Sequence, residues 1–305
     1  MVTAAVIGLG TMGPGIAATL ARGGMTVRGY DTRPEAVEGA GALIAAANNV
    51  LSALGTPERG GPEDVSITDD LAAAVRGADL VIETVPEDLE LKRKVFREID
   101  ALVSKDCVLA SDTSGIPISR LQEGVSNPGR VVGMHWSNPP HIIPVVEVIA
   151  GAQTSQSVVA RMIDAVKGIN LIPIVVRKDV PGFVENRVLY ALLRECVDLV
   201  EQGVIDAEGL DACVSWGIGY KLAVVGPMAL LDMAGLDIYQ AVGSYLNKEL
   251  CARPDVSSLI TARTREGRLG MKTGSGIFDY TPERIAALRQ ARAGKLVAAR
   301  KALEG

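Results

Sequence analysis

Two residues of this chain have the types and spacing needed to move a proton. His135 follows an apolar run and opens the polar segment His-Trp-Ser-Asn-Pro-Pro, and Glu147 lies twelve residues downstream in a second apolar run. Imidazole titrates near neutral pH, and a carboxylate within reach fixes its tautomer and stabilises its protonated form. We therefore predict a histidine general base at the end of a strand, oriented by Glu147.

A glycine-rich segment near the start of the chain indicates a partner for that base. A short apolar run leads into Gly8-Leu-Gly-Thr-Met-Gly13, a helical segment follows, and the next apolar run ends at Asp31. This spacing permits a tight turn against a pyrophosphate at a helix N-terminus, and the acid accepts hydrogen bonds from the adenosine ribose hydroxyls. The predicted contacts with a dinucleotide are Gly8, Gly10, Thr11, Met12, Gly13 and Asp31.

The dinucleotide is expected to be NAD. The charge of Asp31 repels the 2′-phosphate of NADP. Arg33 is interpreted as a solvated loop residue, although an arginine at this position can also pair with a phosphate. Flavin is disfavoured because the chain has no second nucleotide motif and only three Phe and two Trp to form an aromatic pocket. A proton acceptor beside a hydride acceptor predicts a dehydrogenase.

Composition excludes several other classes. The chain has 305 residues, of which 48% are hydrophobic and 22% charged, with a net charge of −5, so nucleic acid and anionic membrane surfaces are not expected partners. The amino terminus has no basic leader, and no stretch approaches the ~20 apolar residues of a membrane span, which predicts a cytoplasmic protein. The four cysteines are interpreted as buried thiols, and no metal site is predicted.

The apolar pattern predicts two domains. Short β-branched runs alternate with helical segments, which favours a Rossmann-type, doubly wound, mostly parallel sheet in residues 1–180. After Lys178-Asp-Val-Pro-Gly182 the apolar spacing becomes helical, so residues 181–305 are expected to form a smaller all-α domain. Its apolar helices, including 224–236, exceed what a domain core needs, which predicts a homodimer. The predicted strands are residues 4–7, 26–30, 80–83, 108–111, 131–134, 145–149 and 172–176.

Motifs throughout the chain resemble one enzyme family. They are Ala-Asp-Leu-Val-Ile-Glu-Thr-Val-Pro-Glu at 78–87, Ser-Asp-Thr-Ser at 111–114, His-x-x-Asn-Pro-Pro at 135–140, Pro-Gly-Phe-Val-Glu-Asn-Arg at 181–187 and Lys-Thr-Gly-x-Gly-Ile-Phe-Asp-Tyr at 272–280. In this order and spacing, together with the glycine-rich turn, they resemble the 3-hydroxyacyl-CoA dehydrogenase family. The resemblance implies that His135 is the base, that Glu147 orients it, and that Ser114 and Asn186 hold the substrate. It also implies cofactor contacts at Glu87, Lys92, Ser114, Asn138 and Lys272.

Structural roles remain open for several of these residues. Ser114 can cap the turn before Ile116, and Asn186 can begin a helix after Pro-Gly. Lys92 is also compatible with an exposed position on the predicted helix 90–99, and Lys272 with a simple turn. His141 lies in a proline-rich loop outside the motifs and is interpreted as structural.

The chain departs from the family where coenzyme A would bind. The resemblance implies a lysine-rich helical arm after the second strand, but no lysine or arginine occurs between Arg33 and Arg59. Further differences are Trp136-Ser137, where the family carries apolar or aromatic pairs, and Glu185 before Asn186. The segments 110–118, 135–144 and 180–190 resemble a bacterial branch of the family that dehydrogenates a formyl-hydroxymethylpyridine carboxylic acid in vitamin B6 breakdown. A small free carboxylic acid is therefore the expected substrate.

Three alternatives remain. The first is a short-chain (S)-3-hydroxyacyl-CoA, such as 3-hydroxybutyryl-CoA, as the substrate of the same dyad. The second is a catalytically silent nucleotide-binding or crystallin-like protein, disfavoured by the joint presence of His135, Glu147, Ser114 and Asn186. The third is a decarboxylating β-hydroxyacid dehydrogenase, which would need a catalytic lysine in a helix where this chain has none between Lys178 and Lys221.

Overall fold

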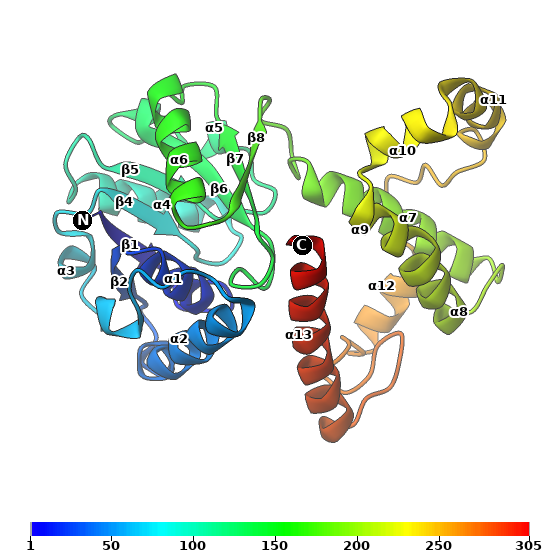
Figure 1. The fold of residues 1–305 in the computed structure, drawn as a ribbon, viewed down its shortest axis with the longest axis horizontal. Helices are drawn as coiled ribbons and strands as arrows, with labels where there is room; N and C mark the ends of the chain where they lie inside the picture. Colours follow the sequence, from blue (N-terminus) through cyan, green and yellow to red (C-terminus); the bar gives the residue numbers. More distant parts are fainter. Residues whose placement is uncertain (1, 305) are drawn as a thin grey trace. The chain divides into compact units, whose positions relative to one another are not determined.

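The computed structural model describes residues 2–304, which form two compact units (Figure 1). The first unit extends to Arg187 and includes Leu296–Arg300 near the end of the chain. Arg300 ties this late segment to the first unit, because its guanidinium donates a hydrogen bond to the Ile142 carbonyl at 3.0 Å. The second unit is formed by Val188–Lys295 and the residues after Arg300.

The first unit is built on an eight-stranded sheet in the order β3-β2-β1-β4-β5-β6-β7-β8. All neighbouring strands are parallel except β6 and β7, which run antiparallel. The predicted mostly parallel sheet is therefore confirmed. One strand, β3, was not predicted. The strands are β1 (Thr3–Ile7), β2 (Thr26–Tyr30), β3 (Val65–Thr68), β4 (Leu80–Glu83), β5 (Val108–Ser111), β6 (Val131–Trp136), β7 (Val145–Ala150) and β8 (Ile172–Val176).

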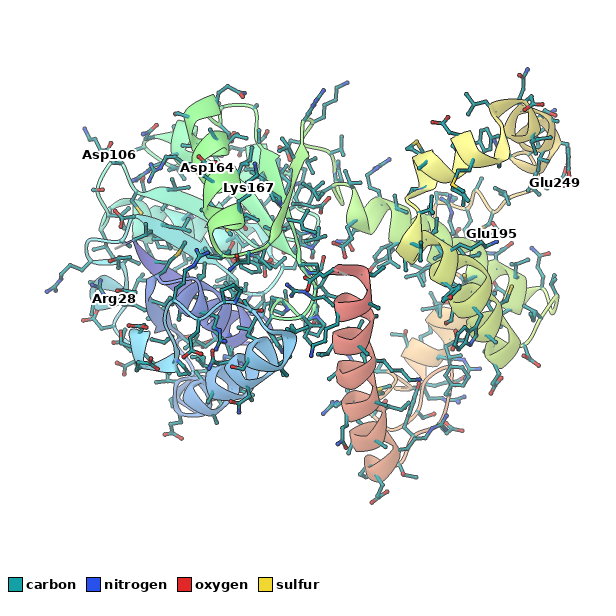
Figure 2. The ribbon with its side chains drawn as sticks, viewed as in Figure 1. Arg28, Asp106, Asp164, Lys167, Glu195 and Glu249 are labelled. Atoms are coloured by element: carbon teal, nitrogen blue, oxygen red, sulfur yellow. The ribbon has the colours of Figure 1, made fainter. Side chains whose placement is uncertain are left out.

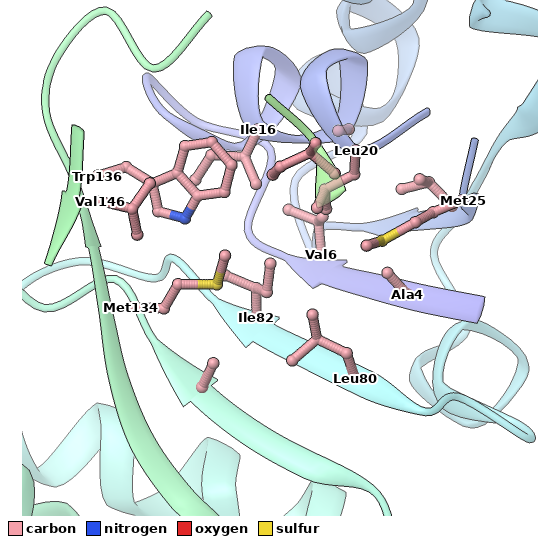
Figure 3. Packing of buried hydrophobic residues seen from close by; sticks show 14 of the residues in the cluster. Ala4, Val6, Ile16, Leu20, Met25, Leu80, Ile82, Met134, Trp136 and Val146 are labelled. Carbon is pink, nitrogen blue, oxygen red and sulfur yellow. The ribbon is translucent and has the colours of Figure 1, made fainter. Parts of the chain in front are cut away.

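Helices cover both faces of this sheet, which is why its central strands are continuous apolar runs. One face packs against α1 (Gly13–Arg22), α2 (Pro34–Leu54) and α6 (Gln156–Gly168), and Figure 3 shows part of that core. The other face packs against α3 (Leu71–Val75), α4 (Leu89–Asp100) and α5 (Ile118–Leu121). Short 3-10 turns at Pro62–Asp64 and Pro128–Arg130 precede β3 and β6.

Helix α6 shows how such a helix divides core from solvent. Val158, Met162 and Val166 recur at helical spacing and are buried. Asp164 and Lys167, labelled in Figure 2, are exposed. The amphipathic pattern of the sequence therefore fixes which side of the helix meets the sheet.

Helix α2 corrects one expectation from the sequence. Among the described residues it is long and apolar enough to span a membrane, and only the bent pair Ala207–Val224 and Pro227–Ala234 also qualifies if it is counted as one span. The expectation that no stretch of the chain approaches a membrane span is therefore wrong by length and composition. In the structure, however, Ala40, Ile44 and Ala47 of α2 belong to the same core as α1.

The second unit is helical, as predicted. Most of its large apolar side chains are exposed within the described chain, including Trp216 at 76% and Met233 at 74%. The elements are α7 (Glu185–Glu201), which begins in the first unit, α8 (Ala207–Ala212), a π-helical segment (Cys213–Gly219), α9 (Tyr220–Val224), α10 (Pro227–Ala234), α11 (Leu236–Leu246), α12 (Ser258–Arg265) and α13 (Pro282–Glu304).

Glu201 on α7 organises part of the second unit. Its carboxylate accepts hydrogen bonds from Ser257, Ser258 and the Leu259 backbone N–H at the start of α12, and it pairs with Arg253. These bonds lower the pKa of Glu201 to about 2. The first turn of α12 is thus fixed to α7 by polar contacts rather than by a closed apolar core.

The expectation of buried thiols holds for only one of the four cysteines. All four are free, and only Cys107 is buried, which raises its pKa to about 11. Cys196 and Cys251 are partly buried, and Cys213 is exposed. The scattered positions of the four cysteines in the sequence gave no sign of this difference.

Substitution of Gly13 by alanine tests the glycine-rich turn. A Cβ at Gly13 would lie 2.0 Å from the Gly8 carbonyl oxygen, so the turn must move, whereas a Cβ at Gly39 on α2 meets nothing within 4 Å. We expect G13A to weaken NAD binding by about tenfold or more, because a displaced turn no longer presents its N–H groups to a pyrophosphate. G39A serves as the control and should raise the free energy of unfolding by about 0.5–1 kcal/mol. Titration calorimetry measures the affinity, and unchanged affinity in G13A would contradict this role of the turn.

Candidate active site

The two residues proposed to move a proton are direct neighbours across the sheet. In the antiparallel pairing of β6 with β7, His135 stands opposite Glu147. The Nδ1 of His135 lies 2.8 Å from Oε2 of Glu147, and both side chains are buried. His135 lies one residue before the end of β6, as the prediction of a strand end implies, and the strand continues to Trp136 instead of ending at residue 134. Directly opposed side chains in a sheet are in contact range, so the register alone brings the pair together.

Glu147 is held as an ionised acceptor. Its second oxygen, Oε1, accepts hydrogen bonds from the backbone N–H groups of Val184 at 3.0 Å and Glu185 at 3.1 Å. Burial raises the pKa of Glu147, but the bonds from His135 and from these two backbone groups outweigh it and leave the pKa below its usual value. An ionised carboxylate only accepts, so His135 carries its proton on Nδ1 and presents Nε2 as the basic nitrogen.

The surroundings of His135 favour its protonated form. Burial lowers its pKa, but the hydrogen bond to Glu147 and the nearby charges of Asp112 and Glu185 raise it above the usual histidine value. The ring of Phe183 lies 6.0 Å from the imidazole, centroid to centroid. The site can therefore accept a proton and stabilise the resulting imidazolium, as a general base must.

A loop after β5 brings the predicted Ser114 and Asn186 together. The side-chain amide of Asn186 donates to the Ser114 carbonyl at 2.7 Å. The loop itself is fixed by Glu87, whose Oε1 accepts from the Thr113 hydroxyl at 2.6 Å and from the backbone N–H groups of Ser114 and Gly115. The structure thus records a positioning role for Glu87. The cofactor contact of Glu87 stays a prediction.

Lys92 occupies a buried position, which excludes the exposed helix position that the sequence also allowed. It is 1% exposed, and its Nζ lies 2.8 Å from Glu83 and 3.4 Å from Glu87. Glu83 also accepts from the Ser111 hydroxyl. A buried lysine requires such partners. The resulting network joins β4, β5 and α4 directly beneath the Ser114 loop.

The glycine-rich turn fits a dinucleotide pyrophosphate. Helix α1 follows Met12 with no side-chain cap and no acidic residue in its first turn, whereas Asp70, Asp88 and Ser155 cap α3, α4 and α6. The first N–H groups of α1 are therefore left to bind an anion. Gly10, Thr11 and Met12 are exposed or partly exposed before α1, while Gly8 has φ of 108°, which favours glycine.

Asp31 links this turn to the ribose position. Its Oδ2 accepts from the Leu9 N–H at 2.8 Å, and Arg33 donates to both of its oxygens from its side chain. Burial raises the pKa of Asp31, but the Arg33 hydrogen bonds and the Leu9 bond outweigh it, so Asp31 stays ionised. Arg33 is thus an ion-paired residue and not only a solvated one. These donors and acceptors fit the adenosine end of NAD.

The other predicted residues lie in different surroundings. Asn138 is exposed after β6, and Lys272 is exposed in a turn of the second unit. His141 packs against Gly15 of α1, in agreement with a structural role. Trp136 belongs to the buried core in Figure 3, so it packs and does not face the dyad.

Two buried acids near the dyad were not predicted as site residues. Asp112 accepts a hydrogen bond from the Trp136 backbone N–H, and burial raises its pKa to about 7. Glu83 anchors Lys92 as described above. Asp112 directly follows the apolar strand β5, and Glu83 is the last residue of the apolar strand β4. An acid at the end of a buried strand was therefore the signal in the sequence that could have identified both residues.

Comparison with known proteins identifies the family. Residues 3–180 match the model of the 3-hydroxyacyl-CoA dehydrogenase NAD-binding domain, and residues 182–280 match the model of the C-terminal domain of the same enzymes. The chain belongs to the 3-hydroxyacyl-CoA dehydrogenase family. It is therefore an NAD-dependent dehydrogenase, as the sequence predicted.

Individual relatives cover nearly the whole chain. A 5-formyl-3-hydroxy-2-methylpyridine 4-carboxylate 5-dehydrogenase of Mesorhizobium japonicum is 60% identical over 99% of this chain and 98% of its own length. A crystal structure of an enzyme of that name, described as an NAD+-dependent dismutase, has a TM-score of 0.98 at 59% identity and covers 100% of this chain and 99% of its own. An L-carnitine dehydrogenase of Streptomyces griseus is 38% identical over 76% of this chain and 69% of its own length.

The pH dependence of oxidation tests the link between Glu147 and His135. Oxidation needs neutral His135, so the rate should rise with pH through a His135 pKa that lies above the usual value. Glu147→Gln removes the charge that stabilises the imidazolium, so we expect the rising limb to move to lower pH and kcat/KM to fall about 100-fold. Glu98→Gln on the exposed side of α4 is the control. If the rising limb of the pH profile keeps its position in E147Q, Glu147 does not stabilise the imidazolium of His135.

Proposed function

We propose that this protein oxidises 5-formyl-3-hydroxy-2-methylpyridine-4-carboxylate, or a similar small free carboxylic acid, in vitamin B6 degradation. The supporting comparison is the 60% identical relative, which is named for that substrate. The observation that carries the proposal is α2, whose exposed residues include the acids Glu35 and Glu38 but no lysine or arginine. Coenzyme A phosphates gain about 1–3 kcal/mol from each charged donor, and α2 supplies none.

The aldehyde is expected to react as its hydrate. Ser114 and Asn186, fixed to each other, hold the substrate near His135. Nε2 of His135 takes a hydroxyl proton, and the imidazolium that forms is stabilised by Glu147. Bound NAD supplies the hydride acceptor. The product of the hydrate is a carboxylate, so the dyad serves this substrate without further catalytic groups.

The alternative substrate is a short-chain (S)-3-hydroxyacyl-CoA. The family of the chain favours it, since the same dyad oxidises a carbinol. The absence of lysine and arginine from the surface of α2 disfavours it. A silent structural protein is disfavoured by the buried His135–Glu147 pair, because an unused buried ion pair carries a desolvation cost.

The proposal includes a cytoplasmic homodimer formed through the second unit. Val224, Met228 and Met233 are each more than two-thirds exposed, and so is Trp216. Apolar patches of this kind on a soluble domain are usually covered by another chain. A second copy would bury the same surface on both chains by twofold symmetry.

Parallel assays of NAD reduction test the substrate. We expect the purified protein to turn over the formyl-hydroxymethylpyridine carboxylate with a kcat/KM at least about 100-fold above that for 3-hydroxybutyryl-CoA. His135→Ala should reduce turnover by about 100-fold or more, since the proton then has no acceptor. Efficient oxidation of the CoA ester alone would refute the proposed substrate and favour the alternative.

Light scattering coupled to size-exclusion chromatography tests the dimer. The expected mass is twice the 32.0 kDa of one chain. Met233→Glu should give single chains, because it places a charge within the proposed interface. Leu43→Glu changes an exposed apolar residue of α2 in the first unit and should leave the mass unchanged. A wild-type mass of one chain would contradict the dimer.

A further inference from the structure

A second polar pair lies beside the catalytic dyad. Ser137 directly follows β6, is 5% exposed, and donates a hydrogen bond from its hydroxyl to Oε2 of Glu185. Glu185 is the first residue of α7. Its backbone N–H is already bonded to Glu147, so the position of Glu185 is fixed by the dyad itself.

The side chain of Glu185 is directed at the reacting centre. Nitrogen or oxygen atoms of His135, Glu147 and Glu185 all lie within 4.8 Å of one another. The Glu185 charge is also among the causes that raise the pKa of His135. The carboxylate of Glu185 is therefore close enough to contact a small group bound at the dyad.

The atoms of this cluster differ in what they can still bind. Both oxygens of Glu147 and the Nδ1 of His135 are engaged with each other or with the backbone. One oxygen of Glu185 accepts from Ser137, and within residues 2–304 no partner is recorded for the other. Two acceptors are thus open at the site, namely Nε2 of His135 and Oε1 of Glu185. A cation would find too few open ligands here, whereas a donor of two hydrogen bonds would be satisfied.

Two neighbouring acceptors suit a carbon atom that carries two hydroxyl groups. An aldehyde hydrate has such a carbon, so one hydroxyl can donate to His135 and the other to Glu185. A secondary alcohol has one hydroxyl, and a carbon chain takes the place of the second. The ionised carboxylate of Glu185, packed against that carbon chain, would lose its hydrating water without gaining a hydrogen-bond donor. This exchange is unfavourable. The pair therefore discriminates between substrate classes.

We propose that Glu185, positioned by Ser137, is the residue that binds the second hydroxyl of an aldehyde hydrate and so selects hydrates for oxidation. This inference rests on the proposed function. In the reaction, one C–H bond breaks and its hydrogen leaves with both electrons as hydride to NAD. One O–H bond breaks and its proton passes to His135. The hydrate carbon becomes the carboxyl carbon, and its remaining hydroxyl is the one held by Glu185.

Comparison of two reactions of the same aldehyde, its oxidation and its reduction, tests this role. Oxidation uses the hydrate, whereas reduction of the same aldehyde by NADH uses the free carbonyl and gives a primary alcohol with a single hydroxyl. We expect Glu185→Gln to lower kcat/KM for oxidation about 10- to 100-fold, because a charge-assisted hydrogen bond is replaced by a weaker one. Reduction should fall less than about threefold. Ser137→Ala should show the same asymmetry with a smaller loss.

The controls separate this role from general damage. Rates are compared on the plateau of each variant's pH profile, so that a change in the His135 pKa does not contribute. Glu249 is an exposed residue of the second unit and is labelled in Figure 2. The control variant Glu249→Gln should match the wild type in both oxidation and reduction. Glutamine at 185 can still accept from Ser137, so E185Q is expected to melt at the wild-type temperature.

Each other outcome overturns the inference. If E185Q lowers kcat/KM equally for oxidation and for reduction, Glu185 only supports the dyad. If it lowers neither, Glu185 does not act at the site. In both cases the wild type still oxidises the pyridine aldehyde, so the proposed function stands. If the wild-type protein does not oxidise the aldehyde at all, the proposed function and this inference fail together.

Discussion

The pairing register of β6 and β7 is the constraint on which the site depends. It sets His135 opposite Glu147 on a single face of the sheet, where both side chains are buried. A shift of one strand by one residue would turn its member of the pair to the opposite face and separate the two side chains. The buried Trp136 resists that shift, since it belongs to the core on the other face. The same register lets Glu147 hold the backbone of Val184 and Glu185, which places the start of α7.

Carboxylates organise the loops of the first unit in a repeated way. Asp31 holds the glycine-rich turn through the Leu9 N–H, and Glu87 holds the Ser114 loop through three donors. Asp179 caps the short helix α5 through the N–H groups of Ile118 and Ser119. Each loop follows a parallel strand, so its polar groups gather where ligands bind in sheets of this type. The site is thus preorganised by bonds to the backbone, which side-chain substitutions elsewhere leave intact.

Much of this arrangement could be predicted from the sequence. The short β-branched runs identified the central strands, and the glycine spacing identified the turn before α1. Strand β3 was missed because Val65-Ser-Ile-Thr is short, only half-buried and at the edge of the sheet. The burial of Lys92 could not be read from helix periodicity, since its partner Glu83 belongs to a preceding strand. Ser137 and Glu185 are 48 residues apart, and only the fold shows that they meet.

The chemistry of the site depends on Glu147, which holds His135 with its proton on Nδ1 and its basic nitrogen at Nε2. The chain has only two histidines, so ¹⁵N-labelled histidine gives a spectrum that His141→Gln assigns at once. Titration by nuclear magnetic resonance should show the Nδ1–H tautomer in the neutral form of His135, with a pKa above the usual value of about 6.5. A neutral form protonated on Nε2, or a pKa below that value, would contradict the account.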